Sequence, residues 1–114
     1  MNSDLEKEAM NKTAYDFKAA LFKALAHPNR LRILAALRAG EKCNCELSPL
    51  LSLEQSNLSR HLLALVETGL VVARKDGVRM MYHVADSSVF ALLDLAGEMV
   101  KREFAHRAGV LEIL

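Results

Sequence analysis

The amino-acid sequence predicts a mainly α-helical domain that carries one small β-hairpin. The composition favours helices packed through aliphatic side chains, since 52% of the residues are apolar, Trp is absent and only five residues are Gly. Apolar residues recur with helical spacing along most of the chain, and a single Asp76-Gly77 pair separates two β-prone runs. The length of 114 residues suits one domain. We therefore expect residues 1–114 to form a single domain with the element order α-α-α-α-β-β-α.

The first two helices are expected on either side of His27-Pro28. The first runs from Asp4 to about Ala26, within an N-terminal segment of about residues 1–26 that contains no Pro or Gly. Its apolar stripe comprises Met10, Ala14, Phe17, Leu21 and Leu25. Pro28 suits the first turn of the second helix, and Gly40 suits its C-terminal end.

Residues 28–69 are expected to hold three consecutive short helices. After the helix that begins at Pro28, the next is predicted over Glu46–Leu51 and the last from Ser52 to about Thr68. Ser52 would cap that last helix, with Glu54 as the alternative cap. Its first turn is polar and rich in hydrogen-bond donors, and a narrow apolar face lies opposite. This succession is the outline of a helix-turn-helix.

Residues 70–85 are expected to form a β-hairpin and residues 86–108 a final helix. The Asp-Gly pair accepts the positive φ angles of a tight turn, which places one strand before it and one after it. The cationic side chains near the turn are Arg74, Lys75 and Arg79. Asp86 or Ser87 would cap the final helix, whose apolar residues keep the 3.6-residue period.

The net charge of +1 does not by itself indicate a nucleic-acid-binding protein, so such a function depends on where the charges lie. Residues 17–42 hold six Lys or Arg residues and one acidic residue. No apolar run approaches the roughly 20 residues that span a bilayer. Cys43 and Cys45 are too close together to staple a domain and are expected to be a thiol pair in a reducing cytosol. We expect a cytoplasmic protein without membrane association.

Three stretches of the sequence resemble the ArsR/SmtB family of winged helix-turn-helix repressors. Residues 24–34 (Ala-Leu-Ala-His-Pro-Asn-Arg-Leu-Arg-Ile-Leu) resemble the second-helix signature of the family, and residues 55–62 (Gln-Ser-Asn-Leu-Ser-Arg-His-Leu) resemble its recognition helix. Residues 41–47 (Glu-Lys-Cys-Asn-Cys-Glu-Leu) are similar to the Cys-x-Cys box of arsenic- and cadmium-sensing members. The resemblance covers nearly the whole chain. It implies a winged helix-turn-helix that binds double-stranded DNA and is not an enzyme.

The first turn of the predicted recognition helix is expected to contact bases in the major groove. Gln and Asn pair well with adenine, Arg pairs with guanine, and Ser donates to phosphate or to a base edge. The resemblance assigns DNA contact to the same positions. The predicted DNA-contacting residues are Gln55, Ser56, Asn57, Ser59, Arg60 and His61, joined on the DNA backbone or minor groove by Arg74, Lys75 and Arg79. The alternative for each is a solvated side chain without a role in DNA binding.

The first and last helices are expected to form a homodimer interface. One short recognition helix contacts only a few base pairs, so specific binding needs two subunits on an inverted-repeat operator. The apolar stripes of these two helices exceed what one small core needs, and the resemblance also implies a dimer. The alternative is that both helices complete the core of a monomer.

Cys43 and Cys45 are the candidate metal ligands. Side chains two residues apart converge in an extended or turn backbone, and thiolates select soft ions. The resemblance implies As(III) or Sb(III) as the first expectation, followed by Hg(II), Cd(II) and Zn(II). Ser48 stands where arsenic sensors often carry a third thiol. The open alternatives are that the two cysteines are small buried apolar residues or a redox pair.

Together these observations predict a transcriptional repressor that a thiophilic ion releases from its operator, with no cofactor needed for DNA binding. Three alternatives stay open. The first is the same fold with a redox signal, a non-metal signal or no ligand. The second is a small thiol-disulfide enzyme, and the third is a protein-docking module. A zinc site on the last helix, where other family members have one, is not expected. Only Asp86 matches that ligand pattern, and Ser88, Met99 and Arg102 stand at its other positions.

Overall fold

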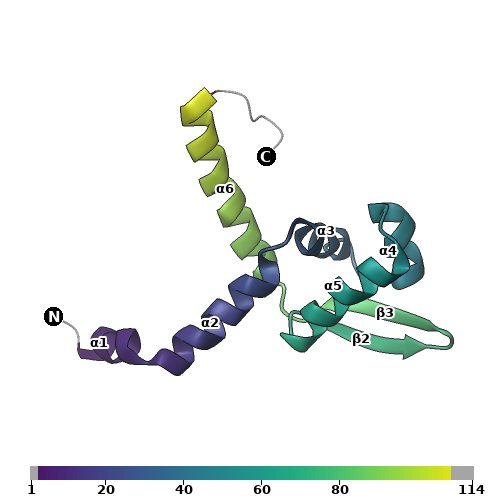
Figure 1. Ribbon diagram of the computed structural model, residues 1–114, viewed down its shortest axis with the longest axis horizontal. Coiled ribbons are helices and arrows are strands. Elements are labelled where there is room, and N and C mark those ends of the chain that lie inside the picture. Colours follow the sequence, from purple (N-terminus) through teal and green to yellow (C-terminus); the bar gives the residue numbers. More distant parts are fainter. Residues whose placement is uncertain (1–2, 109–114) are drawn as a thin grey trace. The chain divides into compact units, whose positions relative to one another are not determined.

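The computed structural model describes residues 3–108, without the side chains of residues 8–10 and 108. The chain divides into two compact units, Met1–Val84 and Ala85–Leu114, each of which is described by itself (Figure 1). The elements of the first unit are α1 (Ser3–Met10), α2 (Lys12–Leu25), α3 (Pro28–Leu37), β1 (Lys42–Cys43), α4 (Asn44–Leu51), α5 (Gln55–Glu67), β2 (Val71–Asp76) and β3 (Arg79–Val84). The second unit holds α6 (Ser88–Ala108). The prediction of a mainly helical fold with a small antiparallel hairpin is confirmed.

The N-terminal segment forms two helices where the sequence predicts one. The break lies at Asn11, whose side-chain Oδ1 accepts a hydrogen bond from the backbone N–H of Ala14 at 3.1 Å and so caps α2. Asn is a favourable N-cap because its side chain satisfies a backbone donor that the first helical turn leaves unpaired. Because the apolar spacing continues across Asn11, it does not indicate that a new helix begins there.

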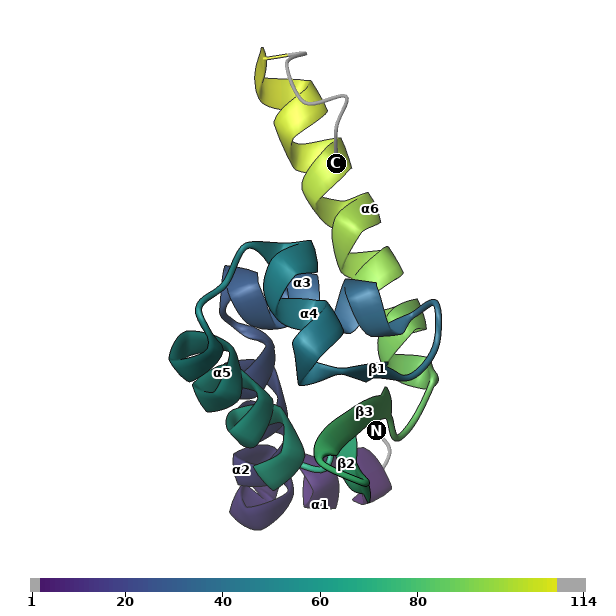
Figure 2. The same cartoon turned by 90° about the vertical axis from the view of Figure 1, so that its right-hand side faces the viewer.

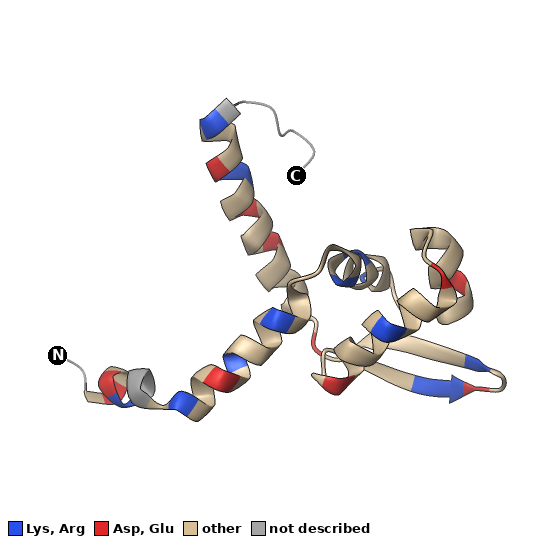
Figure 3. Cartoon of the chain, viewed as in Figure 1, with Lys and Arg blue, Asp and Glu red and all other residues tan. Residues whose placement is uncertain are grey.

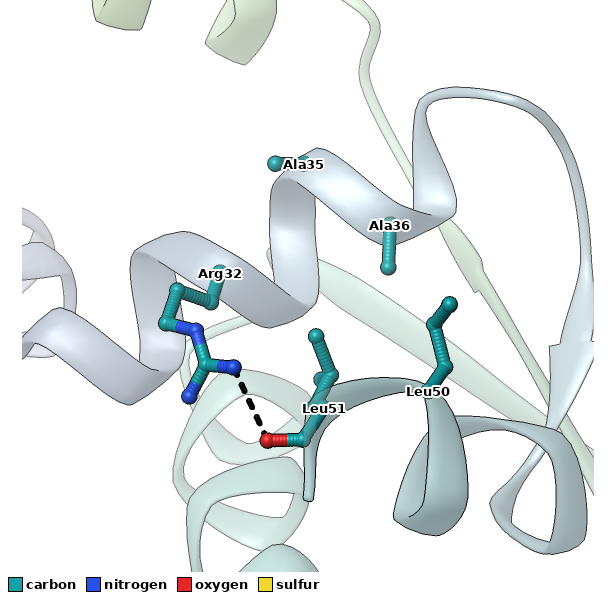
Figure 4. Close-up of a pocket in the computed structure, with 5 residues that line it drawn as sticks. All are labelled: Arg32, Ala35, Ala36, Leu50 and Leu51. Carbon is teal, nitrogen blue, oxygen red and sulfur yellow. Dashed lines mark hydrogen bonds between the residues drawn. The ribbon is translucent and has the colours of Figure 1, made fainter. Parts of the chain in front are cut away.

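A short, tightly hydrogen-bonded turn joins α4 to α5. Ser52 ends α4 in the left-handed conformation, with φ of 53°. The Oγ atom of Ser48 donates to the carbonyl of Leu53 at 2.6 Å, and a guanidinium nitrogen of Arg32 donates to the carbonyl of Leu51 at 2.8 Å (Figure 4). The prediction that Ser52 caps α5 is wrong, because Ser52 closes the preceding helix. Glu54 takes the N-cap position, although its side chain makes no capping hydrogen bond.

The sheet has three antiparallel strands in the order β1-β3-β2, one more than the sequence predicts (Figure 2). The extra strand β1 has two residues and pairs Lys42 with Tyr82 and Cys43 with Met81. Two residues are too few for the alternating pattern by which a strand is found in a sequence. The consequence is that the segment before α4 belongs to the same sheet as the hairpin.

The hydrophobic core of the first unit lies between α3, α4, α5 and the sheet. Its fully buried side chains are Ile33, Leu34, Cys43, Leu47, Leu58, Leu62, Leu65 and Val71. Burying a Leu or Ile side chain contributes about 1.5–3 kcal/mol. Three of these residues, Leu58, Leu62 and Leu65, form the predicted apolar face of α5. The core therefore fixes one face of α5 and leaves its polar first turn outside.

The second unit is one long helix. The carboxylate of Asp86 accepts hydrogen bonds from the backbone N–H and the hydroxyl of Ser88, at 2.9 and 2.7 Å, which agrees with the predicted cap. These bonds hold the pKa of Asp86 below its usual value. Several large apolar side chains of α6 are exposed, namely Leu95, Met99, Val100 and Phe104. None of the helices in the described part of the chain is both long and apolar enough to cross a membrane.

Candidate nucleic-acid interface and cysteine pair

The first turn of α5 presents a polar surface to solvent. Gln55, Ser56, Ser59 and Arg60 are exposed, and Asn57 is half-buried. A guanidinium nitrogen of Arg60 donates to the amide oxygen of Asn57 at 2.9 Å, so these two side chains are held together. The backbone N–H groups of the first turn have no side-chain cap from Glu54. An uncapped helix start with a positive dipole and flexible polar side chains suits both phosphate and base edges.

His61 departs from the other predicted DNA-contacting residues, because its side chain is only 3% exposed. Its Nδ1 accepts a hydrogen bond from Nε of Arg30 at 3.2 Å, and its ring lies 4.2 Å from the ring of His27. We correct the prediction for this residue: His61 lies on the buried face of α5, together with Leu58, Leu62 and Leu65, and not on its exposed face. His61 instead joins α5 to the start of α3.

The environment of His61 disfavours its charged form. Burial lowers its pKa, and electrostatic interactions with the neighbouring His27, Arg30 and Arg60 lower it further. The bond from Arg30 fixes the neutral tautomer, with the proton on Nε2. That Nε2 is buried and has no hydrogen-bond partner among the described residues.

Two cationic side chains of α3, which belong to the basic cluster of the sequence, make hydrogen bonds to other residues of the first unit. Arg30 donates to His61 and also to the carbonyl of Ala24, at 3.4 Å. Arg32 donates to Asn29 and to the carbonyl of Leu51, which anchors the end of α4. A count of charges along the sequence does not show which of them are used in this way.

The hairpin carries its predicted cations near the turn, where Figure 3 shows Lys and Arg close to one acidic residue. Arg79 pairs with Asp76 at 2.9 Å across the turn. Arg74 pairs with Glu41, which precedes β1, through Nε at 2.8 Å and through a second nitrogen. Lys75, between them in sequence, makes no ion pair within the described part of the chain.

Glu41 is a residue that sequence reasoning missed. Its carboxylate accepts from Arg74 and lies 3.5 Å from Nδ1 of His83. The Arg74 guanidinium lowers the pKa of Glu41, and Glu41 in turn raises the pKa of Arg74. Glu41 and Arg74 are 33 residues apart. No local spacing in the sequence signals such a contact, which arises only once β1 joins the sheet.

A partly apolar groove runs between α5 and the hairpin. It is lined by Ser59, Leu63, Val66, Ala73, Met80 and Tyr82. Burial raises the pKa of Tyr82. The groove positions the hairpin beside the exposed turn of α5, so both predicted DNA-contacting elements belong to one continuous surface of the first unit.

The two cysteines lie at the junction of the sheet and α4. Cys43 ends β1 and is fully buried, whereas Cys45 is exposed in the first turn of α4. Their Cα atoms are 5.1 Å apart and their sulfurs form a disulfide. The sequence predicts a pair of free thiols. The structure differs, because the end of β1 and the start of α4 bring the two sulfur atoms to the same side. The predicted convergence of the two side chains is thus met, although Cys45 lies inside a helix.

Cys43 is also the N-cap of α4. Its sulfur accepts from the backbone N–H of Glu46 at 3.1 Å, and the Glu46 carboxylate accepts from the backbone N–H of Cys43 at 3.1 Å. This reciprocal arrangement is a capping box with sulfur in place of a hydroxyl. In the reduced pair, an N–H directed at this sulfur would stabilise a thiolate. The residues present could supply two sulfur ligands to a soft ion, and no cluster of three or more His, Cys, Asp or Glu residues suited to a metal occurs among the described residues.

Comparisons with known proteins agree with this geometry. The pattern described as "Bacterial regulatory protein, arsR family" matches residues 27–72. The chain is 43% identical over 101 residues to the uncharacterized HTH-type transcriptional regulator Rv0081 of Mycobacterium tuberculosis, covering 88% of this chain and 89% of that protein. The crystal structure of Rv0081 superimposes with a TM-score of 0.75 at 40% identity, over 82% of this chain and 95% of that one.

Other relatives carry more specific descriptions. A probable mercury resistance operon repressor of Streptomyces lividans is 40% identical over 81 residues, 71% of this chain and 65% of that protein. An arsenical resistance operon repressor of Staphylococcus xylosus is 38% identical over 71 residues, 62% of this chain and 68% of that protein. The solution structure of the homodimeric winged helix-turn-helix domain of Mb0332 from Mycobacterium bovis has a TM-score of 0.74 at 32% identity, over 83% of this chain and 88% of that one. Sequence, fold and relatives agree that this chain belongs to the ArsR family of winged helix-turn-helix transcriptional regulators.

Proposed function

We propose that this DNA-binding regulator is a homodimeric repressor that binds an inverted-repeat operator through α5 and the β2–β3 hairpin. The observation that carries the proposal is the exposed polar first turn of α5, held in place by the buried apolar face behind it. The residues proposed to contact bases or nearby phosphates are Gln55, Ser56, Asn57, Ser59 and Arg60. Those proposed to contact the DNA backbone are Arg74, Lys75 and Arg79. His61 is left out because it is buried.

The proposed dimer uses the apolar side chains that the two units leave exposed. On α2, Phe17 is 73% exposed and Phe22 is 55% exposed. On α6, Leu95 is 57% exposed and Met99 is 60% exposed. Contiguous exposed apolar side chains are characteristic of surfaces that a partner covers. The homodimeric structure of Mb0332 supports a dimer for this chain as well.

The proposed signal is a thiophilic ion, with arsenite or antimonite first and Hg(II) next, bound by the reduced Cys43 and Cys45. The convergent positions of the two side chains and the N–H directed at Cys43 support two thiolate ligands. The arsenical and mercury resistance repressors among the relatives support the same class of ion. Cd(II) and Zn(II) are less suited, because they prefer four ligands.

Two routes could carry the effect of the ion to the DNA-binding surface. Cys45 lies in the first turn of α4, which packs beside α5. Cys43 lies in β1, which pairs with β3 of the hairpin. A ligand that shifts the junction of β1 and α4 therefore acts on both DNA-binding elements. Coupling of this kind typically changes affinity by about 5- to 150-fold.

The experiment is a titration of the reduced protein with a duplex from upstream of its own coding region, followed by fluorescence anisotropy. Arsenite or antimonite should weaken binding within the range just given, and Zn(II) should not. A duplex of unrelated sequence should bind more weakly and with a steep dependence on salt. Affinity that no ion changes would contradict the sensing function and leave the DNA-binding function in place.

A redox signal at the same pair is the second candidate function, favoured by the disulfide between Cys43 and Cys45. In that reaction a peroxide accepts two electrons, each thiol loses a proton, and the products are one disulfide and two molecules of water. Peroxide would then change the affinity for the operator duplex, and a phosphine reductant would restore it. The two candidates separate because arsenite acts only on the reduced pair and leaves no disulfide behind.

A further inference from the structure

Arg74 is held by a carboxylate in the absence of DNA. Its guanidinium donates to Glu41 through two nitrogens, a bidentate geometry that arginine also uses for phosphate. The pair is accessible, since the side chains of Arg74 and Glu41 are 50% and 27% exposed. An exposed ion pair is worth only about 0.2–1 kcal/mol, so another anion can displace the carboxylate.

The other hairpin cations differ from Arg74 in this respect. Asp76 pairs with Arg79 within the turn itself, so that pair moves with the turn. Lys75 has no carboxylate partner in the described residues. Glu41, by contrast, belongs to a different segment from Arg74 and reaches it across the sheet. Among the described residues, Arg74 is the one of these three cations that pairs with the segment before the cysteines, which the pairing of β1 with β3 also joins to the hairpin.

We propose that Glu41 is an internal competitor of the DNA phosphates for Arg74, and that it sets the affinity of the hairpin for the duplex. The inference rests on the proposed function, in which Arg74 contacts the DNA backbone. With the carboxylate engaged, the pair presents little net positive charge to the duplex. On binding DNA, the guanidinium exchanges the carboxylate for a phosphate, and Glu41 is left beside His83, whose Nδ1 is 3.5 Å away.

The position of Glu41 in the chain gives this competition a link to the cysteines. Glu41 lies two residues before Cys43, immediately before the strand that pairs with β3. Any shift of β1 therefore changes the distance between the carboxylate and Arg74. The same cation is thus available to DNA or withheld from it according to the position of the segment that holds the thiol pair.

The test measures duplex binding of reduced protein at several salt concentrations for Glu41→Gln, Arg74→Gln and the double variant. Glu41→Gln should tighten binding by roughly two- to fivefold per subunit, which is the range expected for releasing one exposed pair. The slope of log Kd against log salt should stay nearly unchanged, because Arg74 neutralises the same phosphate in both proteins. In the Arg74→Gln background, Glu41→Gln should change neither quantity. The matched control is Glu67→Gln, which removes the same charge at the exposed end of α5.

Three outcomes would overturn the proposal. In the first, Glu41→Gln leaves affinity unchanged, or weakens binding, while Arg74→Gln still weakens it. In the second, the gain persists in the Arg74→Gln background or equals the gain from Glu67→Gln, so that it reflects net charge alone. In the third, Arg74→Gln has no effect on binding. The proposed function fails separately, when the unmodified protein shows no salt-dependent duplex binding. Thermal unfolding of each variant checks that the fold is retained.

Discussion

Cys43 and Arg74 lie in the same row of the three-stranded sheet, because both are paired with Met81 of the central strand β3. One end of this row is the buried cysteine of the candidate ion site, and the other end is a cation of the candidate DNA surface. Backbone hydrogen bonds across three strands connect the two. We expect a displacement of Cys43 to reach the hairpin through this pairing and α4 through its N-cap.

Replacement of either cysteine by serine should abolish the response to arsenite and leave the affinity of the ion-free protein for DNA unchanged. Serine is a good N-cap, so Cys43→Ser preserves the capping box of α4. Cys45 is exposed, so Cys45→Ser leaves the core untouched. Anisotropy titrations with and without arsenite measure both quantities. A serine variant that arsenite still releases from the duplex would show that the ion binds elsewhere.

Arg60→Ala and Lys75→Ala should weaken DNA binding in different ways. Loss of a bidentate contact to guanine costs about 1–3 kcal/mol and relaxes specificity at one base position. Loss of a phosphate contact weakens binding to all duplexes alike and reduces the salt slope by about 0.9. Binding to an operator duplex and to an unrelated duplex at several salt concentrations separates the two effects. Equal losses on both duplexes for Arg60→Ala would contradict a base contact.

Phe17→Glu should convert the proposed dimer to a monomer without unfolding the first unit. The Phe17 side chain is 73% exposed, so the core loses almost nothing, whereas a carboxylate buried in a dimer interface is unfavourable. Sedimentation velocity measures the change in mass, and operator affinity should fall because one subunit contacts only a half-site. Lys12→Glu serves as a matched control, since Lys12 is a polar exposed residue of the same helix. A dimer that survives Phe17→Glu would exclude this face of α2 from the interface.

The sequence predicted the elements that local chemistry specifies. Pro28, Gly77 and the apolar spacing of α5 depend only on neighbouring residues, and the structure has the corresponding helix start, turn and buried face. The convergence of Cys43 and Cys45 followed from the same local reasoning. Recognition of the family came from these local motifs in their order.

What the sequence did not predict depends on contacts between distant segments. The strand β1 exists because Lys42 and Cys43 pair with β3, and its two residues carry no pattern of their own. The capture of Arg74 by Glu41 and of His61 by Arg30 joins residues 33 and 31 positions apart. The contact with Arg30 goes with the burial of His61 away from the predicted DNA surface, and the contact with Glu41 gives Arg74 a carboxylate partner in the absence of DNA. The extent of that surface therefore required the fold.

The buried His61 should make the protein less stable as the pH falls. Its pKa is lowered in the folded state by burial and by the neighbouring His27, Arg30 and Arg60, so the unfolded chain binds the proton more readily. Stability therefore rises with pH where the two states differ in protonation, and the contribution is complete above the unfolded value of about 6.5. Below that value stability falls by at most about 1.4 kcal/mol per pH unit for a single group.

Urea unfolding of the reduced protein between pH 5 and pH 8, roughly the range over which histidine titrates, measures this dependence. His61→Gln keeps an acceptor for Arg30 but cannot be protonated, so its stability should vary less with pH than that of the unmodified protein. His83→Gln is the control, since His83 is half-exposed and lies beside Glu41. Equal pH dependence in His61→Gln and the unmodified protein would place the responsible group elsewhere. Because α5 carries both His61 and the DNA-contacting turn, the same protonation should also weaken operator binding in acid.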